Sequence, residues 1–132
     1  MVKRVIPLPV SPEAAATPRE DYVLDSAHHG IAMNPEGTKI CVAGTMSDYA
    51  TVVEADSYQT GKLLKKDGGK PYWVTPSWDG DYCYISWSGT DQISKISYRT
   101  GRIVDTAKVG DHPQRVRNAF VEQSLIDGLP QG

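Results

Sequence analysis

Imidazole, aromatic and guanidinium side chains recur at three places in the sequence, and they are the residues best suited to binding chemistry. Paired histidines can ligate a metal or an axial haem position. Arginine offers a two-pronged fork that matches an anion, and aromatic rings offer flat faces for stacking. The candidate ligand-binding residues are His28, His29, Tyr72, Trp73, His112, Arg115 and Arg117.

Two interpretations of these residues compete. In the functional one, His29, the aromatic pair and the two arginines line one mouth that binds an anionic or aromatic ligand. In the structural one, the rings pack between neighbouring units and the arginine stems cover apolar surface. The histidines lack both a Cys-x-x-Cys-His haem attachment and a third ligand at a fixed spacing. We therefore predict no metal and no cofactor, with haem as the alternative.

The sequence contains no recognisable catalytic motif. Ser86-Trp87-Ser88-Gly89 lacks the Gly-x-Ser-x-Gly pattern that exposes a nucleophile. Gly68-Gly69-Lys70 lacks the upstream glycine and the trailing hydroxyl residue of a phosphate loop. Asp48 and Asp91 are expected to form turns by bonding their own backbone. No catalytic residue is predicted, and a protein that is not an enzyme is expected.

The amino-acid composition argues against several kinds of partner and favours one class of fold. The 132 residues carry 14 Lys and Arg against 16 Asp and Glu, which argues against a nucleic-acid partner. No stretch approaches the ~20 apolar residues of a membrane helix, so no membrane partner is expected. Gly is present 12 times and Pro 9 times, and seven Tyr and three Trp stand against one Phe. This balance favours short strands joined by many turns.

An internal repeat organises the chain. Gly37 and Gly80 lie 43 residues apart in similar surroundings, and Lys70-Pro71 recurs as His112-Pro113 at a spacing of 42. Periods in the low forties are typical of β-propeller blades. We expect an N-terminal Pro- and Ala-rich arm, a blade region and a C-terminal tail; the ranges are 1–20, 21–118 and 119–132. The repeat units cover about 28–71 and 72–113, and a third copy begins at 113.

Each unit predicts four short antiparallel strands, so the predicted fold class is all-β with blades of a β-propeller. Gly61 is expected to supply the positive φ of the hairpin before the fourth strand. A short additional strand is expected at 22–24. The blade strands are predicted at 31–34, 39–43, 50–55 and 62–66 in the first unit, and at 73–76, 82–87, 92–98 and 102–108 in the second.

Tryptophan and cysteine positions give further expectations. Trp78 and Trp87 are expected in the core, because aromatic rings fill the space between blades. Cys41 and Cys83 are expected to be free buried thiols, since stacked sheets lie ~10 Å apart and a disulfide needs Cα atoms within ~7 Å. No signal peptide is predicted, because prolines interrupt the apolar stretch that follows Lys3 and Arg4. The compartment remains open.

The order of motifs in the second unit resembles the YVTN family of β-propeller repeats. The first repeat departs from the pattern at 66–71, where Val-Gly is expected. The resemblance implies a propeller related to the haem-bearing propeller of cytochrome cd-type nitrite reductases, in a family whose members are often exported. The motifs are Trp73-Val74, Asp79-Gly80, the strand 82–87, Asp91, Tyr98-Arg99-Thr100-Gly101-Arg102 and Val109-Gly110-Asp111-His112-Pro113.

The resemblance implies a fold more than an activity. A non-enzymatic repeat module for protein or ligand binding is expected; the alternative is part of a propeller oxidoreductase with a haem- or quinone-type cofactor over the channel. Propellers close with typically 4–8 blades, and this chain predicts about two. The expected partners are therefore other blades, supplied by a longer parent chain or by self-association, and a protein ligand. A small open sandwich is the remaining arrangement.

Overall fold

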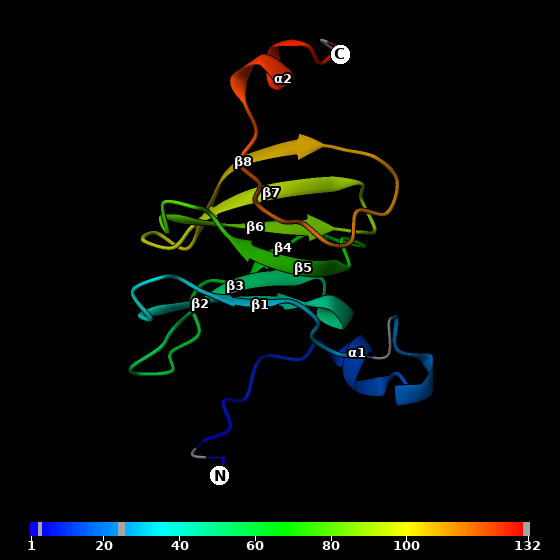
Figure 1. Cartoon of the computed structure of the whole chain (residues 1–132). Coiled ribbons are helices and arrows are strands. Elements are labelled where there is room, and N and C mark those ends of the chain that lie inside the picture. The colour runs from blue at the N-terminus through cyan, green and yellow to red at the C-terminus, as the bar shows by residue number, and fades with distance from the viewer. Residues whose placement is uncertain (3, 24–25, 131–132) are drawn as a thin grey trace.

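The computed structural model describes residues 1–2, 4–23 and 26–130 and contains two four-stranded antiparallel sheets stacked face to face (Figure 1). In each sheet the strands follow one another in chain order, which confirms the predicted blade architecture. The first sheet consists of β1 (Ile31–Met33), β2 (Lys39–Gly44), β3 (Tyr49–Glu54) and β4 (Leu64–Lys65). The second consists of β5 (Pro71–Pro76), β6 (Tyr82–Trp87), β7 (Gln92–Ser97) and β8 (Arg102–Lys108).

The glycine turns follow the repeat with one exception. Gly37 and Gly80, in the first hairpin of each sheet, have φ of 71° and 80°, and Gly101 has φ of 62°. The positive φ expected at Gly61 is wrong, because Tyr58 takes the left-handed conformation in that longer loop, with φ of 62°. Gly61 is required for a different reason: a Cβ there would lie 2.7 Å from the carbonyl oxygen of Val52.

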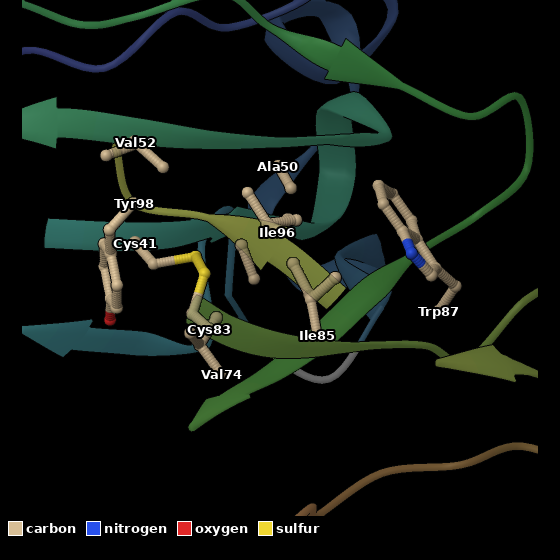
Figure 2. Packing of buried hydrophobic residues seen from close by; sticks show 10 residues of the cluster. Cys41, Ala50, Val52, Val74, Cys83, Ile85, Trp87, Ile96 and Tyr98 are labelled. Carbon is tan, nitrogen blue, oxygen red and sulfur yellow. A yellow bond between two sulfur atoms is a disulfide. The ribbon is translucent and has the colours of Figure 1, made fainter. Parts of the chain in front are cut away.

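Small and branched side chains fill the space between the two sheets (Figure 2). Trp87 closes one end of this core, is fully buried, and donates its indole N–H to Ser94 Oγ at 2.9 Å, as expected for a core tryptophan. Trp78 is 74% exposed, so its predicted core position is wrong. It lies on the face of the second sheet that the first sheet does not cover.

A disulfide joins Cys41 in β2 to Cys83 in β6 across this core, so the expected free thiols are wrong (Figure 2). The two Cα atoms are 6.6 Å apart, well below the spacing of flat stacked sheets. The sheets converge because Gly30, just before β1, lets two backbones touch. A Cβ at Gly30 would lie 2.6 Å from the main-chain nitrogen of Val74 in β5.

The N-terminal arm folds against the first sheet, on the side turned away from the second (Figure 1). It contains α1 (Pro12–Ala16), capped by Ser11, and a 3-10 helix at Arg19–Asp21. The Ser11 N–H donates to Ser47 Oγ at 2.9 Å, which ties the arm to the loop before β3. The strand expected at 22–24 does not form at Tyr22 or Val23, and residue 24 lies outside the described residues.

Residues 113–118, hereafter the 113–118 segment, run along the second sheet without forming an assigned strand, and a third repeat copy beginning at 113 stays a prediction. Ser88 Oγ donates to the Pro113 carbonyl at 2.6 Å, and Thr45 Oγ1 donates to the Pro71 carbonyl at 2.6 Å one blade earlier. The contact between consecutive blades is thus repeated.

Beyond the 113–118 segment the chain forms a short exposed helix, α2 (Gln123–Asp127). Among the described residues, no helix is long and apolar enough to cross a membrane.

Candidate functional site

The candidate site lies at the start of β5, where this strand begins to pair with the second sheet. The pairing of β5 with β6 shifts register between Pro71 and Val74, and the Trp73 N–H bonds to the Ser86 side-chain Oγ of β6 at 3.0 Å instead of to a main-chain carbonyl. Such irregularities re-aim the side chains they carry. Tyr72 and Trp73 therefore project at the inner edge of the blade pair.

Five of the seven predicted site residues lie together in one row: His29 just before β1, Tyr72 and Trp73 in β5, and Arg115 and Arg117 in the 113–118 segment. The His29 ring stacks on Tyr72 with 3.9 Å between centroids and 28° between planes. The Trp73 ring lies 6.3 Å from Tyr72, and the guanidinium carbons of Arg115 and Arg117 each lie 4.7 Å from the Trp73 ring centre. We call these five residues the inner-strand row.

The two arginines give the inner-strand row its charge. Both side chains are exposed, and within the described residues neither forms an ion pair with a carboxylate. Arg117 makes one long side-chain hydrogen bond, 3.5 Å from Nη1 to Thr75 Oγ1. Stacking on Trp73 stabilises the cations but leaves most of their N–H donors free. The row can therefore bind an anion through paired donors beside a flat aromatic face.

Two polar atoms of the row are buried without a hydrogen-bond partner, His29 Nδ1 and Trp73 Nε1. Buried polar groups are nearly always bonded, and an unpaired one costs roughly 1–3 kcal/mol. Both atoms lie in the same stack of rings as the free guanidinium donors. The row thus contains two ring nitrogens whose hydrogen bonds no described residue satisfies.

The structure places the other two candidates elsewhere. His28 Nε2 lies 2.9 Å from the Tyr49 hydroxyl, and burial lowers the pKa of His28. His112 is exposed, and the hydrogen bond and charge of Asp111 raise its pKa. Neither residue joins the inner-strand row.

Two aspartates hold the loops that lead into the inner-strand row, a role that the sequence analysis did not predict. Asp48 and Asp91 were expected to bond their own backbone, and this is wrong. Asp48 Oδ1 accepts the Lys70 N–H at 3.0 Å, and Asp91 Oδ1 accepts the His112 N–H at 3.1 Å, each more than 20 residues away. Both aspartates are left-handed, with φ of 56° and 57°. Their common spacing of 43 residues was the signal in the sequence.

A groove lies next to the row on the uncovered face of the second sheet. Trp78 and Phe120 form its rim, with ring centres 4.5 Å apart in an edge-to-face arrangement. Tyr84 and Ile93 from the sheet, and Val116 from the 113–118 segment, line its floor. An aromatic and aliphatic surface of this kind is suited to being covered by another polypeptide.

The fold is similar to parts of larger solved structures. Hydrazine synthase from Kuenenia stuttgartiensis matches with a TM-score of 0.59 and 21% identity over 66% of this chain and 24% of that chain. A protein of unknown function from Bacteroides caccae gives a TM-score of 0.50 and 17% identity, covering 62% and 29%. A periplasmic gluconolactonase from Pseudomonas aeruginosa gives 0.50 and 15%, covering 67% and 28%.

At these identities the likeness shows the fold alone, and that fold is the β-propeller. The chain spans about a quarter of the length of the structures it matches. A scan against protein families finds no match, and a search of curated proteins finds none. The described residues thus form two four-stranded sheets that match two blades of a β-propeller.

Proposed function

We propose that the chain is a non-enzymatic binding module of a larger β-propeller assembly, and that its ligand binds at the inner-strand row. One observation carries the proposal: the 113–118 segment brings two guanidinium groups, neither of them in an ion pair among the described residues, to 4.7 Å from the ring centre of Trp73. Inner strands of a propeller surround its central channel, so the row belongs to the mouth of that channel. The ligand that fits is an anion with a planar apolar part.

The chemistry of the row is that of recognition. Paired guanidinium groups fix the position of a carboxylate or phosphate, and a stacked ring beside them adds apolar contact. His29 is held by its stack on Tyr72, and the five residues of the row include no serine, threonine or cysteine that could act as a nucleophile. These features support binding over covalent catalysis.

Tryptophan fluorescence of the 132-residue chain tests this proposal. Phenyl phosphate should quench Trp73, and benzyltrimethylammonium, which carries the opposite charge, should not. The double variant Arg115→Ala and Arg117→Ala should lose the response, whereas Arg99→Ala and Arg102→Ala, exposed arginines on another hairpin, should keep it. Equal quenching by both probes, or an unchanged response in the first variant, would refute anion binding at the row.

We further propose that the chain matures in an oxidising compartment. Disulfides persist in secreted and periplasmic proteins and are rare where thiols are kept reduced. The Cys41–Cys83 bond links the two blades and is completely buried. Thiol titration of the unfolded chain, purified from cytosolic and from exported expression, should find the bond only in the exported material.

A further inference from the structure

The 113–118 segment is attached to the second sheet through carbonyl groups that accept side-chain hydroxyls, beginning at Pro113, and through the Asn118 side chain, which donates to the Pro76 carbonyl. The Gln114 carbonyl accepts Ser86 Oγ and the Val116 carbonyl accepts Thr75 Oγ1, both at 2.6 Å. Because peptide groups alternate sides along an extended chain, those of Arg115 and Arg117 point to the opposite edge. No hydrogen bond joins the main chain of these arginines to another described residue. This edge of the segment is open.

The preceding blades show what occupies the equivalent edge. By the repeat spacing, Arg115 and Arg117 correspond to Gly30 and Ala32. The Gly30 carbonyl accepts the Ala43 N–H at 2.8 Å, and Ala32 lies opposite Cys41 in β2. In the first blade this edge therefore bonds to the second strand of the same sheet; in the second blade Thr75 lies opposite Tyr84 in β6, and the Trp73 N–H bonds to the Ser86 side chain of that strand. The 113–118 segment lacks that strand in the part of the chain that the structure describes.

Charge decides which kind of strand fits. Two copies of the 113–118 segment, paired edge to edge, would bring four guanidinium groups together, and like charges on facing strands are destabilising. The extended arm residues near Pro7 and Pro9 cannot substitute, since proline has no N–H to donate to a ladder. The arginines have no carboxylate partner, so an acidic strand complements them.

We propose that the open edge of the 113–118 segment binds an extended acidic strand of a partner protein, which becomes the second strand of a third blade. Acidic side chains of the partner lie opposite or diagonal to Arg115 and Arg117, and its alternate apolar side chains cover the groove at Tyr84 and Ile93. Main-chain bonding supplies affinity, and the charges supply selectivity. This inference rests on the proposed assembly of a larger propeller.

Amide hydrogen exchange, followed by NMR on the full 132-residue chain, tests the proposal. The probe is a capped peptide of about seven residues that alternates Val and Glu, at up to millimolar concentration. It should slow exchange of the Arg115 and Arg117 amides by roughly tenfold or more, and leave the Val116 amide, on the attached edge, unchanged. A matched peptide alternating Val and Lys should give no protection.

Charge reversal makes the test specific. The double variant Arg115→Glu and Arg117→Glu should prefer the Val/Lys peptide by roughly tenfold, whereas Arg99→Glu with Arg102→Glu should keep the original preference. Protection of the same amides without any peptide, together with a dimer in sedimentation, would show that a second copy occupies the edge and overturn the proposal. Protection absent with all peptides would also overturn it. Phenyl phosphate quenching is measured independently, so failure at the open edge and failure of ligand binding are distinguishable.

Discussion

Breaking the Cys41–Cys83 disulfide should destabilise the blade pair strongly. The bond closes a loop with a sequence separation of 42 residues. In the chain-entropy description, a loop of this length restricts the unfolded state by about 4 kcal/mol. Reduction leaves both sulfur atoms in the core, so little packing is lost and the loop entropy dominates. For a chain of this size the loss corresponds to a melting temperature lower by roughly 10–15 °C.

Guanidinium unfolding, followed by tryptophan fluorescence with and without a strong reductant, measures this effect. The double variant Cys41→Ala and Cys83→Ala is the control, because its midpoint should not respond to the reductant. Its own stability should lie below that of the reduced parent, since the two alanines leave space in a fully buried core. Equal midpoints for oxidised and reduced parent would refute the calculation, and an intact mass showing two free thiols would refute the bond itself.

Three further predictions follow from turns, faces and buried groups. Gly37→Val and Gly80→Val should each lower the free energy of unfolding by more than about 1 kcal/mol, because both glycines have positive φ. Urea titration should show the larger loss of unfolding free energy for Gly80→Val. A Cβ at Gly80 would lie 2.8 Å from Pro35, whereas the nearest atom to a Cβ at Gly37 is 3.8 Å away. Two blades leave their outer faces without neighbouring blades, so the isolated chain should self-associate or fold only partly. Light scattering that shows a monomer with cooperative melting would contradict this expectation. Burial raises the pKa of Tyr49 to about 12. The stability that the protonated Tyr49 contributes is therefore complete below the ordinary tyrosine pKa of about 10 and is lost as pH rises toward 12. Between these pH values the urea midpoint of Tyr49→Phe should fall less than that of the parent.

The repeat predicted the fold well because blade structure is local. Each hairpin depends on a nearby turn, such as those at Gly37 and Gly80, and on alternating residues that a short window contains. The same alignment placed His29 and Trp73 at equivalent starts of inner strands, and the structure brings them together. His112 was misplaced because the left-handed turn at that residue, with φ of 47°, leaves it exposed on the loop before the 113–118 segment.

Features that depend on distances between sheets were not predictable from the sequence. The disulfide forms because Gly30 lets β5 approach closely, and average sheet spacing gave the opposite expectation. Trp78 follows the pattern of a core residue, but it lies in the turn between β5 and β6 and is exposed. The distant backbone partners of Asp48 and Asp91 likewise become visible only when consecutive blades are placed side by side.

The two outer faces of the blade pair differ, so a further blade fits one face better than the other. The N-terminal arm lies on the outer side of the first sheet, where the Ser11 N–H bonds to Ser47 Oγ in the loop before β3 (Figure 1). Among the described residues, the 113–118 segment lies on the second sheet's outer face and leaves Trp78 and Phe120 exposed. A blade added beside the first sheet would have to displace the arm, whereas one added beside the second sheet would extend hydrogen bonds and apolar contacts already present. The geometry therefore favours addition of further blades at the second sheet, on the side where Arg115 and Arg117 lie.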